Sequence, residues 1–292
     1  MALLLPLLAF LTGLMLATTP VATQLKTVLS SLLARCFIPI VIIYNMVFYQ
    51  AGSLSLMLFS FVVAILLFYG FLYFSNNKLS ALCFSYVNMA WLGFPFAIAL
   101  FGAKISPAMV ALYIGGSIFG NLWAVTAVSD VPQPFSSMVK KVAYSPPIIA
   151  LSLAALFWLF GIQHWLEQHG IDWIYAAAKL GMSFSGMCVL GMWLRYTKVQ
   201  ASDLWQSSQM AVLKLLCGLV LCGLTYRFIP IPQIEQSIGV MFLLFCLPPA
   251  ANIVALETHY QGTGTSAKSI ASGTMVSCVV VSLYGFMLHL MS

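Results

Sequence analysis

Two apolar stretches of this sequence combine proline with asparagine: SYVNMAWLGFPFAIALFG and MFLLFCLPPAANIVALETHY. Their candidate binding residues are Asn88, Gly93, Pro95, Pro248, Pro249 and Asn252. Proline removes a backbone donor and clashes with the preceding helical turn, so each stretch predicts an interrupted helix. Inside a bilayer the freed amides and carbonyls must face protein or a water-filled cavity. The N-terminal end of a half-helix attracts an anion, so the chemistry predicted here is anion binding.

The asparagines also have a plainer interpretation. A single asparagine in a membrane helix often only hydrogen-bonds a neighbouring helix, which is the residue-based expectation for Asn45 and Asn121. Asn88 and Asn252 each lie beside a predicted break, and an amide offers both a donor and an acceptor. For these two we therefore favour a shared binding pocket.

Charged residues within apolar runs are the next candidates. Arg35 lies about one turn before Pro39, and its guanidinium could bind a carboxylate in a bidentate manner, or it could snorkel to the interface. Lys179 and Lys214 lie near the ends of apolar runs and are expected to snorkel. Glu257 is expected at a solvated helix end, with a proton relay or a pair with Lys268 as alternatives.

Patterns for bond-making chemistry are not found in the sequence. It has no HExxH or GxSxG motif and no pair of carboxylates within an apolar run. The seven cysteines stand in apolar runs without CxxC or Cys/His metal spacing, so they are expected to be small packing residues. We therefore expect no enzyme activity, no metal and no cofactor.

The composition indicates whether the elements that carry these residues lie in water or in lipid. The 292 residues are 62% hydrophobic and only 6% charged, too few charges for a soluble domain of this length. Repeated apolar runs of about 20 residues match the thickness of a bilayer. The net charge of +6 comes from scattered basic residues and does not form a nucleic-acid-binding face. The sequence predicts an all-α integral membrane protein whose partner is the lipid bilayer.

Polar interruptions divide the chain into ten predicted spans. These are residues 2–18, 27–49, 54–74, 80–101, 107–129, 145–163, 171–194, 207–229, 237–258 and 266–290. The first run has no basic residue before it and a poor cleavage context, so we expect a span there and not a signal peptide.

Basic residues predict the orientation. Seven of them lie in or beside connections that follow odd-numbered spans: Lys26, Lys78, Lys140, Lys141, Arg195, Lys198 and Lys268. The opposite connections hold Lys104 and Arg227 among acidic residues. The positive-inside rule then places both termini outside the cytoplasm of a cell inner membrane.

The two halves have similar hydropathy patterns. Residues 1–129 and 145–292 each begin with a proline-bearing span, each have their interrupted span fourth, and are joined by a cytoplasmic loop over 130–144. Five spans per half is an odd number, so the two copies insert in opposite directions. Inverted repeats with matching broken helices are typical of secondary transporters. The sequence thus predicts ten helices in two inverted five-helix repeats, with crossed broken helices 4 and 9.

The order of these motifs resembles the auxin efflux carrier family, which includes plant auxin exporters and bacterial carboxylate carriers. The matching stretches span nearly the whole chain and are NMAWLGFP, LPPAANIV, PLLAFLTG, CFIPIVIIYNMVF, SPPIIA and AVLKLL. The resemblance implies a substrate site where the fourth and ninth helices cross, and elevator-like alternating access between a scaffold and a transport domain. It also implies that the second helix lines the pocket through Pro39, Tyr44 and Asn45.

The chain departs from that family at several points. Ala90 replaces a usual glycine and Trp91 follows it, and the long cytoplasmic loop of the plant exporters is absent. The more distantly related sodium-coupled bile-acid symporters have acidic and amide-rich ion sites that are not matched here. A sodium-coupled carrier of that kind and a channel or sensor are the alternatives to a carrier of small organic anions, with carboxylates as the favoured class. The sequence leaves open the anion, the direction, coupling to protons or to the membrane potential, and whether two copies form a homodimer.

Overall fold

The computed structural model describes residues 4–48, 51–129, 134–163, 166, 171–261 and 263–291, and every regular element in that part of the chain is a helix. The first half contains α1 (Leu4–Leu16), α2 (Ala22–Leu32), η1 (Leu33–Phe37), α3 (Ile38–Val47), α4 (Ser53–Ser75), α5 (Lys78–Ser85), η2 (Met89–Gly93), α6 (Phe94–Phe101), η3 (Ala103–Ile105) and α7 (Ser106–Val128). The second half contains α8 (Phe135–Ala143), α9 (Pro146–Leu159), α11 (Asp172–Leu194), α12 (Ala201–Phe228), α13 (Ile234–Cys246), α14 (Asn252–Gln261) and α15 (Ser266–Met291).

These helices make the chain a multi-pass helical membrane protein. Six helices of the described part are long and apolar enough to cross a bilayer, and a seventh span results if the bent pair α8–α9 counts as one. The six are Ala22–Val47, Ser53–Ser75, Ser106–Val128, Asp172–Leu194, Ala201–Phe228 and Ser266–Leu290. Large apolar side chains such as Leu58, Leu219 and Phe286 are exposed on them, as expected for helices that contact lipid.

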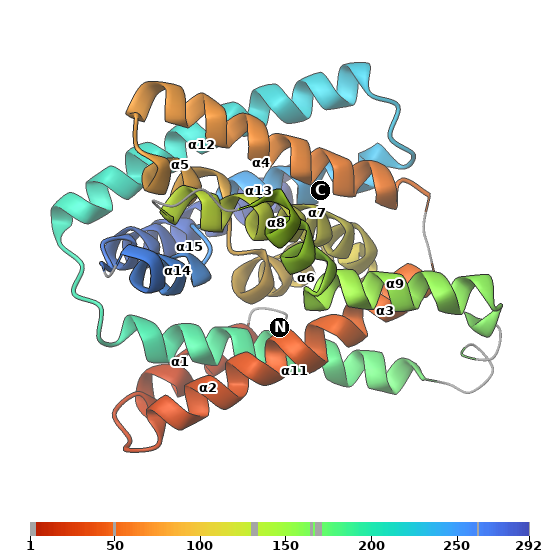
Figure 1. Ribbon diagram of the computed structural model, residues 1–292, viewed down its shortest axis with the longest axis horizontal. Coiled ribbons are helices and arrows are strands. Elements are labelled where there is room, and N and C mark those ends of the chain that lie inside the picture. Colours follow the sequence, from red (N-terminus) through yellow and green to blue (C-terminus); the bar gives the residue numbers. More distant parts are fainter. Residues whose placement is uncertain are drawn as a thin grey trace.

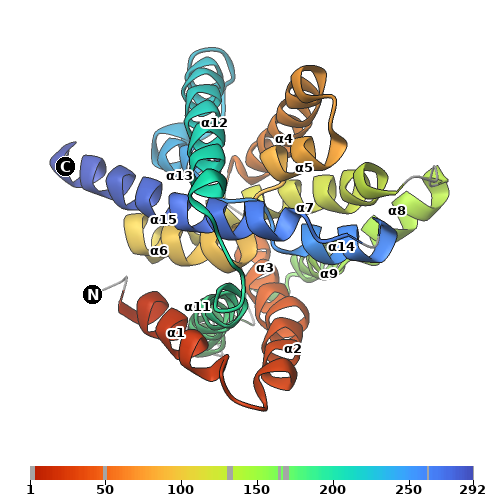
Figure 2. The same cartoon turned by 90° about the vertical axis from the view of Figure 1, so that its left-hand side faces the viewer.

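The helices pack in two groups, each drawn from both halves of the sequence. In the first group α1 packs along α11 and α3 packs along α9. In the second group α4 packs with α5 and α7, while α12 packs with α13 and α15. Figures 1 and 2 show α1, α2 and α11 along the lower edge, α4 and α12 along the upper edge, and α6, α7, α14 and α15 between them.

Glycines allow close contacts between helices within a group and between groups. A Cβ on Gly13 of α1 would lie 2.1 Å from the Cys188 carbonyl oxygen of α11, so the two helix backbones touch there. Gly186 of α11 approaches the backbone of Trp91 in η2. We count η2 with the second group because it continues into α6 and contacts α7 and α13. Small residues allow such close packing where lipid provides no hydrophobic drive between helices.

Two segments are interrupted: the second break lies at Pro248 and Pro249, as the proline pattern predicts, whereas the first lies ahead of Pro95, beside Asn88. The first helix break lies at Tyr86–Asn88, between α5 and η2. The second helix break lies at Leu247–Ala251, between α13 and α14. By contrast, the segment that contains Pro39 is a continuous span from Ala22 to Val47, with a π-helical turn at η1. Pro39 follows this π-helical turn, where the regular α-helical hydrogen-bond pattern is already altered, so the span accommodates it.

Candidate functional site

The two interrupted segments meet and pair with each other. The Asn88 amide donates to the Pro248 carbonyl and the Ala250 amide donates to the Tyr86 carbonyl, each at 2.8 Å, forming an antiparallel bridge between Val87 and Pro249. Backbone groups freed by one break are therefore satisfied by the other. We call this contact the crossing.

The crossing arranges four half-helix ends in two pairs. The N-terminal ends of η2 and α14 begin at Met89 and Asn252, and the C-terminal ends of α5 and α13 are at Ser85 and Cys246. The N-terminal ends carry partial positive charge and the C-terminal ends carry partial negative charge. Each pair of ends borders a cavity of its own.

The first cavity lies at the two N-terminal ends and has a volume of about 290 Å³. Its lining includes residues 86–91 from the first break, residues 250–252 from the second, and Ser30, Ala34 and Ile38 from the segment α2–α3. Three of these residues also border a neighbouring cavity of about 370 Å³, which contains Lys26, Val189 and Trp193. They are Ser30, Trp91 and Ala251. Together the two cavities form a vestibule between the first helix group and the crossing.

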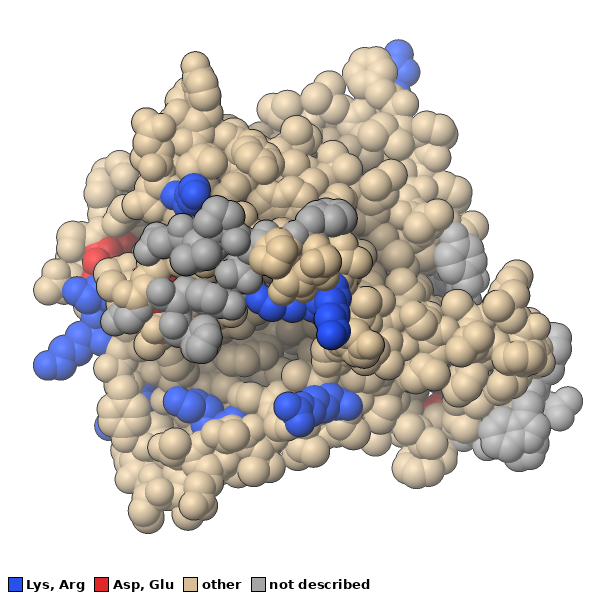
Figure 3. Space-filling view, viewed as in Figure 1, with Lys and Arg blue, Asp and Glu red and all other residues tan. Residues whose placement is uncertain are grey.

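The surface agrees with this vestibule. On the face in Figure 3 the molecule is hollowed between the lower helices and those above them, and Lys and Arg side chains surround the hollow. Among the described residues that line the vestibule, Lys26 is the only charged one. Its electrostatic character therefore favours an anion.

Asn88 and Asn252 both belong to the vestibule, as the sequence pattern predicts. Asn88 is buried, and its side-chain oxygen accepts from the Trp91 amide at 3.1 Å, which caps η2. The Asn88 side-chain nitrogen has no hydrogen-bond partner in the described part of the chain. The Asn252 side-chain nitrogen donates to the Tyr86 hydroxyl at 3.1 Å. A buried amide donor without a partner is costly, so this nitrogen is an unsatisfied polar group beside the crossing.

Gly93 and Pro95 lie beyond the first break, inside the continuous helical segment η2–α6. Both are buried and do not line the vestibule. A Cβ on Gly93 would lie 2.6 Å from the Met109 side chain and 3.0 Å from that of Leu247, so glycine allows η2 to pack tightly beside the second break. These two residues are placed to shape the crossing.

Tyr44, Asn45 and Arg35 lie apart from the crossing. The Tyr44 ring stacks on Tyr175 of α11 at 4.0 Å, and its hydroxyl donates to Asp172 at 2.5 Å. Asn45 bonds the Val41 carbonyl and accepts from the Tyr175 hydroxyl. These contacts hold α3 against α11 within the first group. Arg35 is exposed on η1 and is not part of the vestibule lining.

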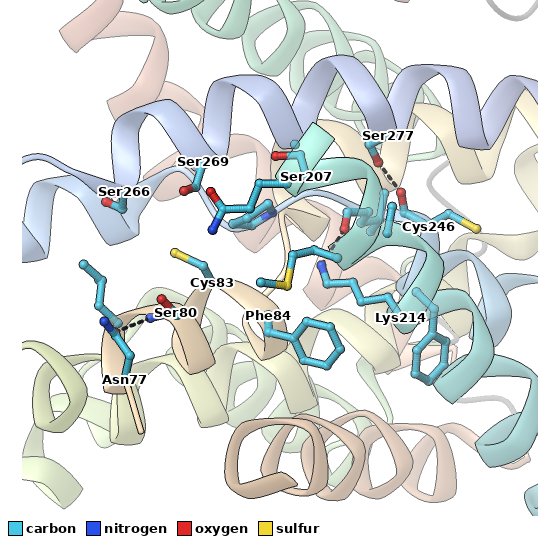
Figure 4. A pocket seen from close by; sticks show the side chains of 18 of the residues that line it. Asn77, Ser80, Cys83, Phe84, Ser207, Lys214, Cys246, Ser266, Ser269 and Ser277 are labelled. Carbon is cyan, nitrogen blue, oxygen red and sulfur yellow. Dashed lines mark hydrogen bonds between the residues drawn. The ribbon is translucent and has the colours of Figure 1, made fainter. Parts of the chain in front are cut away.

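The second cavity lies on the opposite side, at the two C-terminal ends, and has a volume of about 190 Å³. Figure 4 shows it between α5, α12 and α15, with Lys214 beside the second break and serine side chains along α15. Lys214 is only 5% exposed, and its ammonium donates to the Leu247 carbonyl at 2.9 Å. It does not snorkel, contrary to the expectation from its position in the sequence, because it reaches inward to a carbonyl that the break leaves free.

Glu257 is a second correction. It is fully buried at 0% exposure, and not at a solvated helix end. Its carboxylate accepts hydrogen bonds from Thr263, Thr265 and Ser266, which connect α14 to the start of α15. The position of Glu257 in the sequence did not predict this, although the hydroxyl residues of GTGTS, which leads into α15, are a recognisable source of such donors.

The described residues contain no group of three or more His, Cys, Asp or Glu side chains placed to hold a metal ion. The seven cysteines are all free thiols. No protein-family model matches this chain, and no similar protein is found among the curated ones. The function must therefore be inferred from the geometry of the crossing.

Proposed function

We propose that this chain is a secondary transporter that carries a small organic anion, with carboxylates as the favoured class, by alternating access across the bilayer. The observation that carries this proposal is the crossing, where two broken helices pair and direct two N-terminal ends at one vestibule. Interrupted helices at membrane depth are tolerated where they are buried in protein or line a water-filled cavity, and this arrangement is typical of transporter binding sites.

The electrostatics of the vestibule support an anionic substrate. The half-helix dipoles of η2 and α14 place partial positive charge at its end, and the uncommitted Asn88 nitrogen adds a donor. Lys26 contributes a full positive charge to the outer part of the vestibule. A carboxylate bound between Asn88 and Asn252 would accept these donors while the apolar remainder contacts side chains such as Trp91.

The packing of the helices supports a repeat architecture with two mobile parts. The first two predicted spans of each half pack against each other across the halves, as α1 with α11 and α3 with α9. The remaining spans pack within their own half in the same pattern, as α4 with α5 and α7, and as α12 with α13 and α15. We propose ten spans in two inverted repeats, a scaffold made of the first group, and a transport domain made of the second group. The orientation proposed is that of the basic residues, with both termini outside the cytoplasm.

Uptake into proteoliposomes tests this proposal. Purified protein is reconstituted and tested with labelled mono- and dicarboxylates under an imposed proton gradient or membrane potential. We expect saturable uptake that the Asn88→Ala, Asn252→Ala double variant lowers by about tenfold or more, which corresponds to the loss of one or two good hydrogen bonds.

Asn121→Ala is the matched control. The Asn121 amide donates within its own helix to Ser117, which lines the first cavity. Its removal takes away a membrane-embedded amide and leaves the backbone pairing of the two breaks in place. Full uptake by the double variant would show that Asn88 and Asn252 do not form the substrate site. Single-channel currents in place of saturable uptake would favour a channel.

A further inference from the structure

The carbonyl groups at the second break are satisfied by three different donors. Asn88 donates its backbone amide to the Pro248 carbonyl, Ser277 donates its hydroxyl to the Cys246 carbonyl, and Lys214 donates its ammonium to the Leu247 carbonyl. Two of these donors are neutral and one is a full positive charge. A neutral donor would also satisfy the Leu247 carbonyl, so the positive charge of Lys214 needs a further explanation.

The place of the Lys214 ammonium gives that explanation. It lies where α5 and α13 both end, so it faces the partial negative charge of two half-helix C-termini. The face of the Phe84 ring, near the end of α5, adds a cation–π contact at 5.9 Å. In the described part of the chain Lys214 has no acidic side chain in salt-bridge distance and lines a cavity without Asp or Glu. The crossing itself thus provides what stabilises the buried charge.

In transporters with broken helices, unwound carbonyls and half-helix C-termini are the groups that coordinate a co-transported sodium ion or proton. Building on the function proposed above, we propose that the Lys214 ammonium is the resident cation of this crossing and takes the place of a mobile coupling cation. Lys214 is a positioning residue: it acts through the second break and does not touch the vestibule. Transport by this chain is then independent of sodium.

The cavity around Lys214 makes a sharp test available. Lys214→Ala removes the last three carbons and the nitrogen of the side chain, which are the atoms of propylammonium. The polar side chains of Asn77, Gln206 and Thr265 also line this cavity, so a small cation that enters it meets polar groups. Added propylammonium should fill the vacated space, whereas a neutral molecule of the same size should not.

The experiment compares wild type, Lys214→Ala, Lys214→Met and Lys214→Arg in uptake and in thermal unfolding. We expect Lys214→Ala and Lys214→Met to lose about tenfold or more in uptake, the equivalent of one charge-assisted hydrogen bond. Propylammonium should restore uptake and raise the melting temperature of Lys214→Ala, whereas 1-propanol should do neither. Lys214→Met, whose side chain fills the space, should not respond, and Lys214→Arg should retain part of the uptake.

Replacing sodium by N-methylglucamine should leave wild-type uptake unchanged. Equal rescue by 1-propanol would reduce Lys214 to a space-filling role, and wild-type uptake that stops without sodium would overturn the proposal. The unfolding measurement needs no substrate: if no carboxylate is transported but propylammonium still selectively stabilises Lys214→Ala, the transport function fails and the resident cation stands.

Discussion

The Glu257 carboxylate is enclosed by donors from one short stretch of chain. One oxygen accepts from the Thr263 hydroxyl at 2.6 Å and from the Thr265 amide and hydroxyl, each at 2.7 Å. The other accepts from the Ser266 amide at 2.9 Å and from the Ser266 hydroxyl. The carboxylate thus closes the connection between α14 and α15, and it is satisfied without a cation.

Glu257→Gln should destabilise the protein because glutamine has one acceptor and one donor at the end of its side chain. Whichever way the amide turns, its NH₂ group faces a backbone amide, of Thr265 or of Ser266, that cannot rotate away. We expect a loss of about 1–3 kcal/mol, the cost of a buried donor without a partner, seen as a lower melting temperature. Glu235→Gln, at an exposed position in the first turn of α13, is the control and should stay near wild type. An unchanged melting temperature for Glu257→Gln would contradict this view of the connection.

Residue types and spacing predicted that Asn88 and Asn252 line one pocket, because proline and asparagine act on the local backbone. They could not anticipate Lys214, whose surroundings come from other elements: Leu247 is 33 residues from Lys214 in the chain. The donors to Glu257 lie close to it in the chain, but their direction depends on how the connection between α14 and α15 folds. Tyr44 and Asn45 also show that contacts between distant elements are not predictable from the sequence pattern. The helix that contains them was expected correctly, but the direction of their side chains depends on α11, and they contact Tyr175 there and not the vestibule.

At the scale of elements, the contact of α1 with α11 depends on glycine in both helices. A Cβ on Gly13 would lie 2.1 Å from the Cys188 carbonyl oxygen, and one on Gly191 would lie 2.3 Å from the Phe10 carbonyl oxygen. These neighbours are backbone atoms, which cannot turn aside. The two helices would have to separate to admit a side chain.

Gly13→Ala should therefore destabilise the first helix group by about 1–3 kcal/mol, the usual cost of overpacking. Alanine is a better helix former than glycine, so helix propensity alone would predict the opposite sign. Gly70→Ala in α4 is the control, because nothing lies within 4 Å of its added Cβ, and it should be neutral or slightly stabilising. Thermal unfolding of both variants in the same detergent makes the comparison, and equal behaviour of the two would show that the close contact does not matter.

Hydropathy predicted most elements, because a run long enough to cross a bilayer is visible without knowledge of packing. Hydropathy could not predict the exact bounds of the first break. Asn88, Gly93 and Pro95 suggested a break over the whole stretch, whereas the chain is helical again from Met89. The reason is that the Asn88 side chain caps η2, and Pro95 follows the π-helical turn of η2, where the regular α-helical hydrogen-bond pattern is already altered.

At the scale of the whole molecule, the two helix groups contact each other over a limited set of elements, chiefly α11 with η2 and α3 with α7. The vestibule lies in this boundary, between α2 and α11 on one side and the crossing on the other. The sequence could indicate two similar halves, but the grouping of helices across those halves depends on long-range packing that periodicity does not encode. If the groups move as rigid bodies during transport, their boundary must slide.

A disulfide across this boundary should arrest transport. An ideal Cβ on Gly186 of α11 lies 3.4 Å from the Trp91 Cβ of η2, close to the separation of about 3.5–4.5 Å in disulfides. We expect the Trp91→Cys, Gly186→Cys double variant to lose uptake when oxidised and to regain it with reductant, up to the level of the weaker single variant. Mass spectrometry of the oxidised protein identifies the bond, which is needed because the chain has seven cysteines of its own. Each single variant controls for the substitution itself. An oxidised double variant that transports as fast as its reduced form would mean that η2 and α11 stay together throughout the cycle, and the boundary between moving parts would then have to lie elsewhere.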